Sequence, residues 1–204
     1  MRKYSVMGDY KLFVNVILIF TVIFLFSTSY GASTDLNAIL TSLKDNAEPL
    51  MRFVVATSYV IGLWFMIAAM GDLKKIGQSA SAQAQGGING PLIKLVIGAL
   101  LFYLPSTINI GIATFWGNDS GIMGYQAENG DVFGHLKGGV IAVVQVIGYI
   151  SLVKGLVILS KSAEQGSQQD TFSKGITHVI GGILAINIVG TIGAISSTLG
   201  IEIF

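Results

Sequence analysis

The stretch that decides the fold is residues 171–187, TFSKGITHVIGGILAIN, where a polar loop becomes a long apolar segment rich in glycine. Residues 94–100, KLVIGAL, align with residues 178–184, HVIGGIL, at a separation of 84 residues, and Thr107-Ile108 aligns with Thr191-Ile192 in the same register. Upstream, the VIG at residues 60–62 aligns with the VIG at residues 146–148, at a separation of 86. The two registers differ by a small gap that falls in a loop. The alignments predict a duplicated helical hairpin.

The composition is that of a membrane protein. Of the 204 residues, 52% are hydrophobic and 11% are charged, whereas about a quarter of the residues in a soluble domain are charged. The net charge of +1 gives no indication of a nucleic-acid partner. The chain has no cysteine, which excludes disulfides and cysteine-based metal sites but assigns no compartment. We expect no cofactor.

Residues 1–31 read as a secretory signal peptide. Arg2, Lys3 and Lys11 precede an apolar run of about 15 residues, which small residues such as Ser29 and Gly31 follow at a candidate cleavage site. An uncleaved N-terminal anchor is the alternative, because the run comes close to the roughly 20 residues that span a bilayer. Residues 32–52 then have apolar residues at helical spacing. They predict an exported amphipathic helix, on the membrane surface or packed on neighbouring subunits, before Pro49 turns the chain.

Four apolar segments follow and predict four transmembrane helices, at residues 53–70, 92–116, 138–159 and 175–199. Pro105 is expected to kink the second. The fold class is therefore an all-α membrane protein, with transmembrane hairpin 1 at residues 53–116 and transmembrane hairpin 2 at residues 138–204. An acidic exported loop at residues 117–137 joins them.

The distribution of Lys and Arg predicts the orientation. With the N-terminus inside, nine of these residues lie on the cytoplasmic side and only Lys44, Arg52 and Lys137 lie outside. The loop of each hairpin is then cytoplasmic and the C-terminus is periplasmic. Two hairpins in the same orientation are parallel repeats.

The predicted spans contain no Asp or Glu, and no nucleophile–base, metalloprotease or phosphate-loop spacing occurs. The two histidines, His135 and His178, are expected near opposite membrane faces and so cannot share one site. We expect no enzymatic activity and no metal.

Small and polar residues share faces of the predicted spans. Such faces bring helix backbones close together, because lipid gives apolar helices no drive to associate. A water-lined pore wall is the alternative and would use the same residues. The candidates are Gly98, Pro105 and Asn109 on one face; Gln145, Gly148 and Gly155 on another; Asn187, Gly190 and Thr191 on a third; and Gly181 with Gly182.

Three basic side chains, Lys94, Lys154 and His178, are expected at the cytoplasmic membrane interface. Lys94 and His178 match in the repeat alignment. They would either extend to lipid head groups or line a pore mouth in an oligomer.

The final hairpin carries a family resemblance. The quoted stretch, in a chain of this size with a signal-like start and four further spans, resembles the IcmC/DotE proteins; its motif is Thr171-Phe172, Gly175, His178, Gly181-Gly182, Leu184-Ala185 and Asn187. These are inner-membrane components of the Dot/Icm type IVB secretion system, with relatives in conjugative transfer. A smaller single-hairpin relative in that apparatus, IcmD/DotP, would fit the duplication. The family supplies no active-site residues.

The resemblance implies a non-enzymatic subunit that helps to move effector proteins from a bacterium into a host cell. Its partners would be other inner-membrane subunits, membrane lipid and further copies of itself. A small stand-alone transporter or channel is the alternative, and a pore-forming lysis protein is a third.

Overall fold

In a computed structural model, residues 36–78, 88–117, 121–122, 134–162 and 169–200 are described, and their regular structure is entirely α-helical. The helices are α2 (Leu36–Gln78), α4 (Asn89–Phe102), α5 (Leu104–Trp116), α6 (Gly134–Ser162), α7 (Gln169–Ile186) and α8 (Ile188–Leu199). The predicted signal segment, the polar hairpin loops and most of the acidic loop lie outside the described residues.

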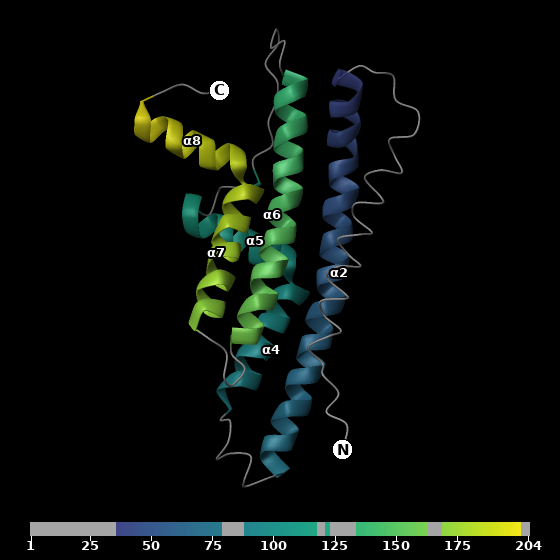
Figure 1. Ribbon diagram of the computed structural model, residues 1–204, viewed down its shortest axis with the longest axis vertical. Coiled ribbons are helices and arrows are strands. Elements are labelled where there is room, and N and C mark those ends of the chain that lie inside the picture. Colours follow the sequence, from purple (N-terminus) through teal and green to yellow (C-terminus); the bar gives the residue numbers. More distant parts are fainter. Residues whose placement is uncertain (1–35, 79–87, 118–120, 123–133, 163–168, 201–204) are drawn as a thin grey trace.

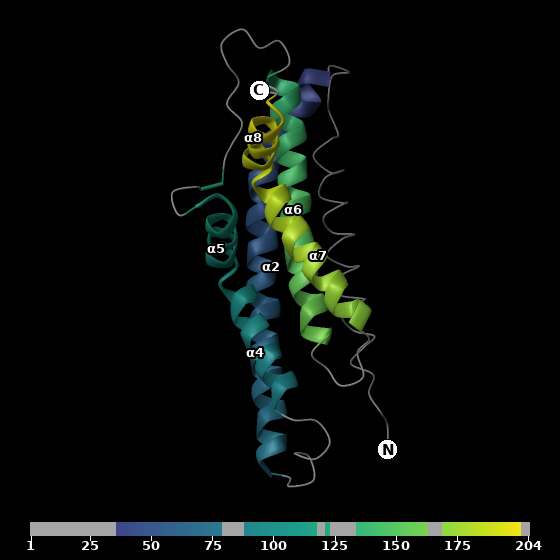
Figure 2. The same ribbon diagram turned by 90° about the vertical axis from the view of Figure 1, so that its left-hand side faces the viewer.

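The two longest helices, α2 and α6, lie side by side and run in the same direction (Figure 1). Helix α4 returns along α2, and α7 returns along α6, so each long helix has one antiparallel partner. The remaining helices, α5 and α8, leave the bundle crosswise to the same side. Figure 2 views both nearly end-on and shows α7 crossing α6 obliquely.

Two continuous helical segments are long and apolar enough to cross a membrane, Lys44–Gln78 in α2 and Leu136–Ser162 in α6. The other two predicted spans are each divided by a sharp bend, which was expected only for the second, at Pro105. The second is divided into α4 and α5 at a bend of 94°, and the fourth into α7 and α8 at a bend of 88°. Each bent pair counts as a span only if its two parts are taken together, so the described residues hold two to four spans.

Pro49 does not turn the chain, contrary to the prediction, because α2 continues through it. The amphipathic segment and the first span are one helix. Ala47 and Leu50 on either side of the proline are buried against Ala142 and Val146 of α6. This packing outweighs the backbone hydrogen bond that an interior proline removes.

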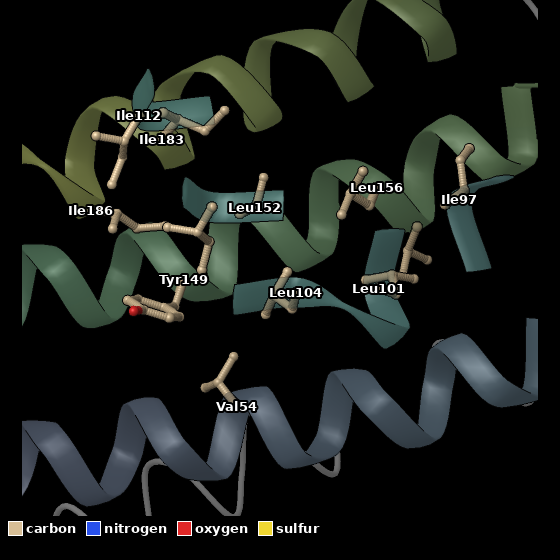
Figure 3. Close-up of a cluster of buried hydrophobic side chains, with 12 residues drawn as sticks. Val54, Ile97, Leu101, Leu104, Ile112, Tyr149, Leu152, Leu156, Ile183 and Ile186 are labelled. Carbon is tan, nitrogen blue, oxygen red and sulfur yellow. The ribbon is translucent and has the colours of Figure 1, made fainter. Parts of the chain in front are cut away.

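The main core lies where α2, α4, α6 and α7 meet, and α5 covers one side of it. Leu101, Leu104, Ile112, Leu152 and Ile186 are fully buried in it. Figure 3 shows Leu152 of α6 between side chains of α4, α5 and α7. The core therefore joins the two helix pairs into one body.

Candidate functional site: glycine contacts and two clamped helix breaks

Gly148 and Gly182 form the closest contact between α6 and α7. A Cβ atom at Gly148 would lie 2.7 Å from the Ile186 nitrogen and 2.9 Å from the Gly182 oxygen. A Cβ atom at Gly182 would lie 2.7 Å from the Leu152 nitrogen. Because these are backbone atoms of the facing helix, only glycine allows the two helices to approach this closely.

The same contact occurs between α2 and α4. A Cβ atom at Gly62 would lie 2.6 Å from the Gly98 oxygen and 2.5 Å from the Phe102 nitrogen. In return, a Cβ atom at Gly98 would lie 3.0 Å from the Gly62 oxygen. Gly62 was absent from the predicted set, although the alignment of residues 60–62 with residues 146–148 contained the signal for it.

A second glycine pair tightens the α6–α7 contact alone. A Cβ atom added at Gly155 would lie 2.9 Å from the Gly175 oxygen. Gly175 in turn faces the side chain of Leu159. At the matching positions of the first pair the sequence has Ala69 and Pro91. Helices α6 and α7 therefore approach closely over a longer stretch than α2 and α4.

The two helix breaks have nearly the same backbone geometry. Tyr103 has φ −103° and ψ 43°, and Asn187, 84 positions later, has φ −104° and ψ 50°. The N–H of Tyr103 donates to the Ala99 carbonyl at 2.9 Å, and the N–H of Asn187 donates to the Ile183 carbonyl at 3.1 Å.

A threonine clamps each break. Thr107 Oγ1 lies 2.8 Å from the Leu100 oxygen and 3.2 Å from the Tyr103 oxygen, and its proton is shared between these carbonyls. Thr191 Oγ1 lies 2.9 Å from the Leu184 oxygen and 3.0 Å from the Asn187 oxygen. In an unbroken helix the Leu100 and Leu184 carbonyls would accept backbone N–H groups. The hydroxyl replaces that lost donor.

The first break separates residues that were predicted to share a face. Gly98 is buried on α4, whereas Pro105 and Asn109 are exposed on α5. In the last segment, Asn187 is buried at the break, and Gly190 lies against its side chain, where a Cβ atom would meet Nδ2 at 2.6 Å. Thr191 donates to backbone carbonyls at the same break.

Two further candidates are placed differently from the packing glycines. Gly181 is exposed, and a Cβ atom there would meet nothing within 4 Å. Gln145 lines a groove of about 210 Å³ between α2 and α6, together with Lys44, Glu48 and Gly138.

The three basic candidates differ in their surroundings. Lys94 Nζ lies 3.5 Å from an Asp72 carboxylate oxygen, and its side chain is only 19% exposed. At the matching position, the carbonyl of His178 accepts a hydrogen bond from Ser151 Oγ at 3.1 Å. Lys154 is exposed. The structure does not bring the three together into one site.

Across the described ranges, no group of three or more His, Cys, Asp or Glu residues could hold a metal ion. The hydroxyls of Thr107 and Thr191 donate to backbone carbonyls at the two breaks, so they hold each helix pair in its bent shape. Comparison with protein-family models, with curated proteins and with solved structures finds no match to this chain.

Proposed function

We propose that this chain is a non-enzymatic, polytopic inner-membrane subunit of a type IVB secretion apparatus, needed for translocating effector proteins. The observation that carries the structural part of the proposal is the duplicated glycine contact with its clamped break, which gives the chain a rigid scaffold. The resemblance of residues 171–187 to the IcmC/DotE proteins supports the choice of apparatus.

The scaffold consists of two parallel repeats. The first comprises α2, α4 and α5, and the second comprises α6, α7 and α8. The matched break residues, the matched threonines and the matched glycine pairs, Gly62 with Gly98 and Gly148 with Gly182, support this division. The common direction of α2 and α6 is that of parallel repeats.

In the bacterial inner membrane, the hairpin loops would face the cytoplasm, where Lys and Arg accumulate. Helices α4 and α7 would then run toward the periplasm, and α5 and α8 would follow at their periplasmic ends. The polar loops and the beginning of α2 would offer docking surfaces to other inner-membrane subunits. Exposed apolar side chains such as Trp64, Tyr103 and Ile110 provide contact with lipid or with those subunits.

Co-purification from the source bacterium tests the proposal. A tagged chain, expressed from its own locus and extracted in mild detergent, is expected to bring other inner-membrane subunits of the apparatus with it. The control is an unrelated tagged polytopic protein from the same membrane, which should not bring them. Recovery of the chain without any of those subunits would contradict the proposal.

The broken helices favour a second candidate, a stand-alone transporter or channel, because transporters form their binding sites at discontinuous helices. In such sites the freed carbonyls face the substrate or ion. Here the Leu100 and Leu184 carbonyls accept threonine hydroxyls instead, which favours a structural role for the breaks. Solute flux into liposomes that contain only this protein would support the transporter.

A further inference from the structure

Helix α5 of the first repeat packs against α7 of the second. A Cβ atom at Gly111 would lie 2.7 Å from Ile183 Cδ1 and 3.1 Å from its Cγ1. Ile108, about one turn before Gly111, and Ile112, the residue after it, are buried in the same core. Figure 3 shows Ile112 next to Ile183. Helix α5 thus joins the first repeat to the second by packing on α7.

Helix α8 is more exposed than α5. Positions 84 residues after Ile108, Gly111 and Ile112 are Ile192, Ile195 and Ser196. Ile195, which matches Gly111, is 49% exposed, whereas Ile192 and Ser196 are half-buried. Only Gly190 is buried along α8, whereas Leu104, Ile108 and Ile112 are buried along α5.

The surface that would receive α8 is also open. Because α5 packs on α7, the matching element for α8 is an α4 helix, and Ala99 occupies the position that matches Ile183. Ala99 is half-buried, and it shares a helical face with Leu92, Val96 and Tyr103, which are 45%, 55% and 63% exposed. An α4 helix therefore presents an apolar face with a small residue in its middle.

The residue sizes at the two contacts are complementary. In the contact within the chain, glycine at position 111 faces isoleucine at position 183. At the matching positions the large residue is on the crosswise helix instead: position 195 of α8 is isoleucine and position 99 of α4 is alanine. Each pair combines one isoleucine with one small residue, so the total volume is nearly conserved, which is the kind of exchange that a packed contact tolerates.

We propose that α8 of one copy of this chain packs against α4 of a second copy, with Ile195 over Ala99, and so continues the contact that α5 makes with α7. The contact is heterologous, because each copy packs its α8 on one neighbour and its α4 against another. Repetition of the contact therefore builds a ring or a row. The proposal does not depend on the secretion function.

Cysteine cross-linking in native membranes tests the contact, and the chain has no cysteine of its own. Two differently tagged chains are co-expressed, one with Ala99→Cys and the other with Ile195→Cys. After mild oxidation, we expect a dimer that carries both tags, in at least tenfold higher yield than from either variant alone. Leu63→Cys, at an exposed position of α2, replaces Ala99→Cys as the negative control and should give no such dimer.

The fold is checked in parallel by a chain with Gly111→Cys and Ile183→Cys, whose cysteines should join within one chain. Formation of that bond without any Ala99–Ile195 dimer would overturn the proposal and indicate that lipid covers α8. A cross-link from Ile195→Cys to a different protein, in place of the dimer, would also overturn it and identify another subunit as the occupant.

Discussion

Gly182→Ala is expected to lower the free energy of unfolding by about 1–3 kcal/mol, the usual effect of overpacking a close contact. The added Cβ atom would lie 2.7 Å from the Leu152 nitrogen and 3.0 Å from the Gly148 oxygen. Backbone atoms cannot rotate away as a side chain can, so α6 and α7 have to separate along their whole contact. The measurement is unfolding of the purified protein in detergent, followed by helical circular dichroism against denaturant.

The neighbouring glycine provides the matched control. Gly181→Ala introduces the same methyl group one residue earlier, where nothing lies within 4 Å. Alanine has a higher helix propensity than glycine, so this variant should be as stable as the wild type or more stable. Equal destabilisation by the two substitutions would contradict the glycine contact.

Thr191→Val is expected to straighten the second bent helix pair. Valine keeps the shape of threonine but removes the hydroxyl that lies 2.9 Å from the Leu184 oxygen. Leaving a buried carbonyl without a hydrogen-bond donor raises the free energy of the bent form by about 1–3 kcal/mol. No proline lies near this break, so the N–H of Ile188 can bond to Leu184 once the bend opens. The bent form therefore loses its advantage over one continuous helix.

The distance between spin labels at Phe172→Cys and Leu199→Cys, both exposed positions, measures the change. At a bend of 88° the two backbone positions are about 29 Å apart, and in a straight helix they are about 40 Å apart at 1.5 Å per residue. Thr191→Val should populate the long distance, whereas Thr191→Ser should keep the short one. An unchanged distance in Thr191→Val would show that the hydroxyl does not hold the bend.

The first break provides an internal comparison, because Pro105 lies at the start of α5. Proline has no N–H and disfavours helical geometry in the residue before it. The bend at Tyr103 should therefore persist in Thr107→Val and be lost only when Pro105→Ala is added. The same distance measurement, with labels at Ile93→Cys and Phe115→Cys, checks this asymmetry.

The sequence predicts the all-helical membrane class and the packing glycines Gly98, Gly148, Gly155 and Gly182, because apolar length and glycine spacing are local properties. The bends are harder to predict. Hydropathy is the same for a straight segment and a bent one, and no residue near Asn187 forbids a helix. The bend is visible only in the recurrence of Thr107 at Thr191, and the sequence alone does not show that each hydroxyl donates to a carbonyl seven residues earlier.

Two other differences come from contacts between distant segments. Gly181 and Gly182 are equivalent in composition, but they point about 100° apart around α7, and only the position of α6 distinguishes them. Pro49 predicts a turn, yet α2 continues because Ala47 and Leu50 both pack on α6. In each case a contact between distant segments decides what the local pattern leaves open.

Effector translocation in a strain that lacks this gene tests the central claim most directly. The proposed role predicts that translocation into host cells is lost, that general protein secretion continues, and that the wild-type chain supplied from a plasmid restores translocation. Normal translocation in the deletion strain would contradict the assignment to the secretion apparatus.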